Sequence, residues 1–93
     1  MEKFIAIIEK ARGNYSAYLP DVPGCVSTGL TIDETLENIK QALEFHLETM
    51  AEEGESMPVP VSLEEHLSNG DIILDDEVII AYVNVLLSKE LSA

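Results

Sequence analysis

The sequence predicts an α+β fold of order βββαβ, in which one long helix covers one face of a four-stranded sheet. Three observations predict it. Short apolar runs joined by turns fill residues 3–28, an apolar stripe of helical period follows, and a β-branched run occupies residues 78–85. A chain of 93 residues has room for one domain, so we treat 1–93 as a single unit.

The first three strands are expected to form an antiparallel meander. Residues 3–9 are apolar on both alternating faces, which is typical of a central strand, and a turn follows at 11–14. Residues 15–19 and 25–28 supply the next two strands. The loop between these two contains two prolines, which remove backbone donors, and Gly24, which permits a positive φ.

The long helix is predicted from its periodicity and its ends. Thr31 and Glu34 form a capping box, in which the Thr31 hydroxyl accepts from the amide of Glu34 and the Glu34 carboxylate returns to the amide of Thr31. Gly54 is expected to end the helix. The apolar positions recur every three or four residues on one face: Ile32, Leu36, Ile39, Leu43, Leu47 and Met50.

A short second helix is expected from Ser62 to Asn69, before the last strand at 78–85. A right-handed crossover through the long helix would lay this strand beside the first and parallel to it, in a mixed sheet of order 3-2-1-4. Because one helix covers only one sheet face, we expect a second copy of the chain to cover the other face. The protein is therefore expected to be a homo-oligomer, a dimer or a tetramer.

The charge of the chain excludes several classes of partner. Eighteen acidic residues against five basic ones give a net charge of −13, which disfavours unaided binding to nucleic acid or to an anionic membrane and favours a basic protein partner. The longest apolar run, at 78–87, is too short to span a membrane. A single cysteine and an N-terminus without a signal-peptide pattern predict a cytoplasmic protein.

The titratable residues show no pattern of catalysis, cofactor binding or metal binding. His46 and His66 are the two imidazoles, and no HxxxH or CxxC spacing is present. Cys25 has no base in a local motif, so we interpret it as a packing residue, and we interpret the acids at 75–77 as a solvated turn. The protein is predicted not to be an enzyme.

The outer face of the long helix holds the candidate partner-binding residues. Glu37, Glu44 and Glu48 point away from the apolar stripe, where they would meet a basic partner. Phe45 lies about 180° from the centre of the stripe. An exposed Phe is common on helices, and the alternative is that Phe45 belongs to an interface.

One continuous pattern resembles a known family. A strand ending in Pro-Asp-Val-Pro-Gly-Cys leads through a glycine to a Thr-capped acidic helix start within 18–34, and a Met-Pro-Val-Pro run follows at 57–60. With the helical pattern of 39–47, this order is similar to the signature of the HicB-like antitoxin family over about residues 4–61. Its motif residues are expected to act structurally: Pro20, Asp21, Pro23, Gly24, Cys25, Thr31 and Glu34.

The resemblance implies a truncated ribonuclease-H-like fold without the nuclease carboxylates. It also implies oligomerisation and neutralisation of a small basic HicA-like toxin, an mRNA-cleaving protein whose catalytic histidine the antitoxin covers. The alternative is an orphan oligomeric module that binds another protein or a small ligand. A residual nuclease is disfavoured because the first strand, at 3–9, has no carboxylate in its central part.

Two positions and the C-terminal residues depart from the family pattern. Thr35 stands where an alanine is usual, and Leu30 stands where a polar residue is common. Many members carry a DNA-binding domain after the last strand, and residues 88–93 are too few to form one. DNA binding is therefore not expected of this chain.

Overall fold

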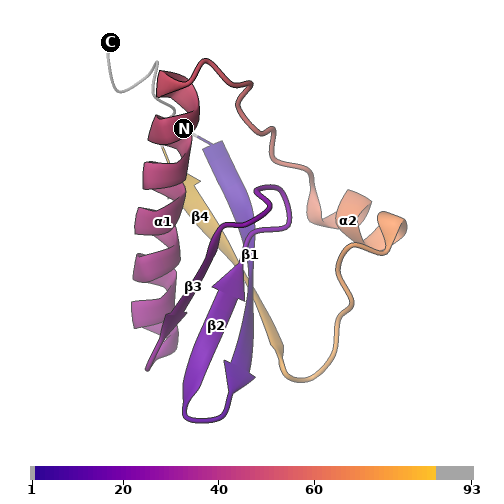
Figure 1. The fold of residues 1–93 in the computed structure, drawn as a ribbon. Coiled ribbons are helices and arrows are strands. Elements are labelled where there is room, and N and C mark those ends of the chain that lie inside the picture. The colour runs from indigo at the N-terminus through magenta and orange to yellow at the C-terminus, as the bar shows by residue number, and fades with distance from the viewer. Residues whose placement is uncertain (1, 86–93) are drawn as a thin grey trace.

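The computed structural model describes residues 2–85, so the expectation about 88–93 lies outside the described residues. The strands form one four-stranded sheet, which Figure 1 shows between a long helix and a shorter helical segment. The elements in chain order are β1 (Glu2–Ala11), β2 (Asn14–Tyr18), β3 (Val26–Gly29), α1 (Ile32–Glu52), α2 (Leu63–Asn69) and β4 (Val78–Val85).

The α+β class, the single long helix and the strand order β3-β2-β1-β4 are confirmed. The predicted direction of the last strand is wrong. β4 pairs with β1 in antiparallel register from Glu2 opposite Val85 to Glu9 opposite Val78, so every neighbouring pair in the sheet is antiparallel and the sheet is not mixed.

The path between α1 and β4 explains this error. A parallel β4 needs one passage along the sheet between β3 and β4, and α1 alone would supply it. The chain instead makes a second passage, through residues 53–77, which returns along the opposite side of the sheet and includes α2 (Figure 1). Two successive passages reverse the direction in which β4 enters the sheet.

One face of the sheet packs on α1. Alternate residues of β1 point to this side, and they are fully buried with the central part of the helix's apolar stripe and the last residues of β4. The helix also lies close to β3 at Gly29, where there is no space for a side chain. A Cβ added to Gly29 would lie 2.6 Å from Oγ1 and 2.7 Å from the backbone nitrogen of Thr35. The core on this side includes Phe4, Ala6, Ile8, Ile39, Leu43, Leu47, Val83 and Val85.

The other face of the sheet has a second, smaller core. Ile5 and Ile7 of β1 are buried there with Ile72, and Leu63 and Ile80 are packed against them. Part of this face is thus covered by the chain's own α2 segment. The premise that one helix leaves this whole face uncovered is therefore wrong, and association with a second copy stays a prediction.

The helix starts match their predicted caps with one difference. The Thr31 hydroxyl accepts from the Glu34 amide at 3.0 Å, as predicted, but the Glu34 carboxylate accepts from the amide of Leu30 at 2.9 Å and not from that of Thr31. The side chain therefore reaches one residue further back and caps the entering chain. Ser62 accepts from the amide of Glu65 at 3.2 Å at the start of α2.

Replacing Gly29 tests the close approach of β3 to α1. The Cβ of Gly29→Ala would overlap both the side chain and the backbone of Thr35, so β3 or the helix must move. We expect the free energy of unfolding, measured by urea titration, to fall by about 1–3 kcal/mol.

Gly24→Asn is the control. A Cβ at Gly24 meets no atom within 4 Å, and Asn tolerates the positive φ of 86° better than other residues with a Cβ. A Gly29→Ala variant as stable as the wild type would show that the packing of β3 on α1 is looser than described.

Candidate functional site

The structure places the predicted partner-binding residues on the solvent side of α1. Glu37, Glu44 and Glu48 are exposed and follow one another at intervals of seven and four residues, which puts them on one face of the helix. Gln41 lies within this face and donates to Glu37 at 3.2 Å. Phe45 is 71% exposed beside the acidic stripe. These four predicted residues therefore form one accessible surface.

The predicted motif residues from Pro20 to Cys25 lie in a tight loop between β2 and β3, whereas Thr31 and Glu34 cap α1. The amide of Val22 donates to the carbonyl of Leu19 at 3.0 Å, and the amide of Cys25 donates to the carbonyl of Val22 at 3.1 Å. Leu19, Val22 and Cys25 are all buried in the core under α1. Burial raises the pKa of the Cys25 thiol, which keeps it protonated and agrees with a packing role. Pro20, Pro23 and Gly24 complete this loop.

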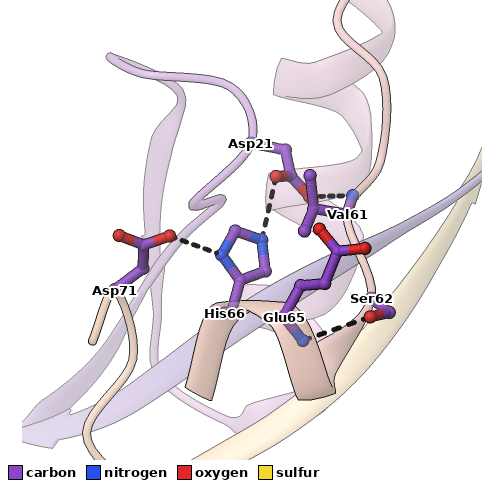
Figure 2. Close-up of polar contacts among 6 residues, drawn as sticks. All are labelled: Asp21, Val61, Ser62, Glu65, His66 and Asp71. Atoms are coloured by element: carbon purple, nitrogen blue, oxygen red, sulfur yellow. Dashed lines mark hydrogen bonds and ion pairs between the residues drawn. The ribbon is translucent and has the colours of Figure 1, made fainter. Parts of the chain in front are cut away.

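Asp21 of this loop reaches across to the segment that precedes α2. Its Oδ2 accepts from the amide of Val61 at 3.1 Å, and its Oδ1 lies 2.9 Å from Nε2 of His66 (Figure 2). The side chain is only 5% exposed. One buried carboxylate thus joins two parts of the chain that are 40 residues or more apart in sequence.

His66 is held between two carboxylates. Its Nδ1 lies 3.0 Å from Oδ2 of Asp71, on the opposite side of the ring from Asp21, and Figure 2 shows the imidazole between the two. The ring is buried, whereas the Asp71 side chain is half exposed. We call these three residues the Asp21–His66–Asp71 cluster.

The cluster favours a protonated imidazole. Burial lowers the pKa of His66, but the hydrogen bonds and negative charges of Asp71 and Asp21 outweigh this effect, so the pKa is raised above its ordinary value. A protonated ring donates from both nitrogens, one to each carboxylate, whereas a neutral ring donates from only one. Protonation therefore strengthens the link between the motif loop and α2.

The geometry of the cluster suits a clamp better than a catalytic group. Both ring nitrogens are already engaged, and a general base needs a free nitrogen within reach of a substrate. Within residues 2–85, no three His, Cys, Asp or Glu side chains are arranged to hold a metal ion. In the same part of the chain, no helix combines the length and the apolar character that crossing a membrane requires.

Sequence reasoning identified Asp21 through the family motif but missed its partners. His66 is 45 residues from Asp21, and no local spacing links them. The signal available in the sequence was the short separation of His66 and Asp71, which are five residues apart on either side of the turn that ends α2. His46, the other imidazole, lies on α1 and is half buried.

Replacing His66 tests the clamp through its pH dependence. Because the pKa of His66 is raised in the folded chain, its stabilisation is complete below the ordinary value of 6.5 and is lost as the pH rises through the folded value. We expect the loss in free energy of unfolding caused by His66→Gln to be larger at about pH 6 than at about pH 9.

His46→Gln is the control, because it removes an imidazole from α1, on the other side of the sheet. A His66→Gln effect of the same size at both pH values would contradict the charged clamp. Urea titrations of the wild type and both variants measure these differences.

Comparison with known proteins identifies the family. Residues 4–92 match the family model described as HicB_like antitoxin of bacterial toxin–antitoxin system. An uncharacterized 14.9 kDa protein of Haemophilus phage HP1 is 41% identical over 61 residues, which cover 66% of this chain and 46% of that protein. A UPF0150 protein of Helicobacter pylori is 48% identical over 42 residues, covering 45% and 58%. The matches thus span about half the length of these curated relatives.

Solved structures agree with this result. The crystal structure of the Burkholderia pseudomallei antitoxin HicB has a TM-score of 0.80 and 32% identity, covering all of this chain and 70% of that one. A chain of the HicA3 and HicB3 toxin–antitoxin complex has a TM-score of 0.69 and 25% identity, covering 88% and 95%. The match of 4–92 to the family model, together with this shared fold, shows that the chain belongs to the HicB-like antitoxin family.

Proposed function

We propose that this chain neutralises a small basic HicA-like toxin, an mRNA-cleaving protein, by binding it directly. The observation that carries the proposal is the similarity to a chain of the HicA3 and HicB3 complex, which extends over 88% of this chain. Membership of the HicB-like antitoxin family supports the same role.

The distribution of charge supports a basic partner. The outer stripe of α1 presents Glu37, Glu44 and Glu48 to solvent, and acids outnumber bases by thirteen over the whole chain. A toxin that binds RNA needs a positively charged surface for the phosphate backbone. An acidic antitoxin surface would attract the same residues of the toxin and compete with RNA for them.

The proposed action is non-enzymatic. The central residues of β1 are apolar and buried from Phe4 to Ile8, so this part of the strand offers no carboxylate to a metal ion or a substrate. The buried imidazole of His66 has both nitrogens occupied. Inhibition would then require only that the complex blocks the toxin's active site. In this proposal the chain binds neither a cofactor nor a nucleic acid. It acts in the cytoplasm, where mRNA is found.

We also propose that the chain forms a homo-oligomer. Several large apolar side chains remain exposed even though α2 covers part of the second sheet face, and exposed apolar surface of this kind favours association. Those on the strands are Val26, Ile79 and Tyr82.

Charge reversal on α1 tests the toxin-binding surface. The triple variant Glu37→Lys, Glu44→Lys and Glu48→Lys changes the net charge from −13 by three steps of +2, to −7. We expect its affinity for the HicA-like toxin of the same host, measured by calorimetry, to fall at least ~tenfold, and the salt dependence of binding to become weaker.

A matched control carries the same charge change elsewhere. Glu55, Glu64 and Glu77 are exposed outside the α1 stripe, and their reversal to Lys also gives −7. Equal loss of affinity in both triple variants would show that total charge, and not the α1 surface, governs binding.

A further inference from the structure

The two edge strands of the sheet differ in length and in how far other parts of the chain cover them. β3, at one edge, is four residues long and lies close to α1, where the Asn38 side chain donates to the carbonyl of Thr28 at 2.8 Å. β4, at the other edge, is eight residues long and pairs only with β1 among the described strands. Alternate residues of β4 therefore direct their N–H and C=O groups away from the sheet.

β4 also lacks the features that normally prevent edge pairing. Its sequence from Val78 to Val85 contains no charged residue and no proline, and its register with β1 is continuous, without a bulge. Tyr82, near its middle, is 55% exposed. Natural edge strands are usually protected by charges, prolines or bulges, so a long apolar edge without them indicates a pairing site.

We propose that β4 pairs antiparallel with β4 of a second copy of this chain, across a two-fold axis, so that the two sheets become one sheet of eight strands. Side chains alternate between the faces of a sheet. A register in which a residue pairs with its own copy keeps both α1 helices on one face and both α2 segments on the other.

The groove beside β4 supports a second copy as the occupant. It runs between α1 and β4 and is lined by Asp33, Glu37 and Lys40 on the helix and by Tyr82 and Asn84 on the strand. A two-fold axis near Tyr82 places the two α1 helices side by side in opposite directions. The proposed dimer then brings the grooves of the two copies together, so that Lys40 of each copy adds a positive charge near the acids of the other.

The charges argue for a copy and against the basic toxin at this edge. Two chains of net charge −13 repel each other, so they can associate best through a surface with little charge, and β4 has none. Lys40 is the single Lys or Arg between residues 13 and 88, and it lies beside this strand. A basic toxin would be drawn to the acidic stripe of α1.

The interface rests on the proposed self-association and not on the proposed toxin binding. Sedimentation equilibrium of the wild-type chain over a concentration series is expected to give twice 10.2 kDa. Moderate salt should strengthen the dimer by screening the repulsion of the two acidic chains, whereas it should weaken a complex with a basic toxin.

Tyr82→Lys tests the edge directly. Two lysines would face each other across the axis, and we expect the dissociation constant of the dimer to rise at least ~tenfold. The variant changes the net charge from −13 to −12, which by itself would favour association, so a loss must come from the local contact. Phe45→Lys makes the same charge change at an exposed residue of α1 and should stay dimeric.

A mixture completes the test. Equal amounts of Tyr82→Lys and Tyr82→Glu are expected to form a heterodimer, because the new charges are then opposite. If Tyr82→Lys does not fold, Asn84→Lys, which is exposed on the same strand face, replaces it. If the wild type is dimeric and Tyr82→Lys leaves the dimer unchanged, pairing through β4 is overturned, but self-association is not. If the wild type is monomeric, self-association is overturned as well. Toxin binding is measured separately in both cases.

Discussion

The structure depends on the Asp21–His66–Asp71 cluster, which holds the α2 segment against the second face of the sheet. Asp21 belongs to the loop between β2 and β3, whereas His66 and Asp71 belong to the returning passage that leads to β4. This passage covers Ile5 and Ile7 with Ile72, and it brings the chain to the end of the sheet from which β4 runs antiparallel to β1. One polar cluster between distant segments thus holds the passage that covers the second sheet face and sets the direction of β4.

Local features of the sequence predicted local structure well. The capping residues Thr31 and Ser62, the period of the α1 stripe and the two-sided apolar character of β1 each act within a few residues. They therefore identify the elements, and the bounds of the strands are predicted to within two residues. The strand order followed from the connection rules. The direction of β4 did not follow, because it depends on the course of residues 53–77, where short helical and extended pieces carry no pattern of a second passage.

In the candidate site, too, local features could be predicted from the sequence and long-range contacts could not. The exposure of Glu37, Glu44 and Glu48 follows from helical geometry, and Asp21 was singled out by the family motif. The contact of Asp21 with His66 joins residues 45 apart, and only the folded chain brings them together. Two surfaces then differ in their physics: the stripe of α1 is acidic and suits a basic partner, whereas β4 is uncharged and suits a copy of the same chain.

The central proposal is that this chain directly inhibits an mRNA-cleaving toxin. The most direct measurement is RNA cleavage by the purified HicA-like toxin of the same host, titrated with the purified chain. We expect cleavage to fall in proportion to the added chain and to stop at a fixed stoichiometry, and we expect the chain alone to leave the RNA unchanged. Undiminished cleavage at a large excess of the folded chain would contradict it.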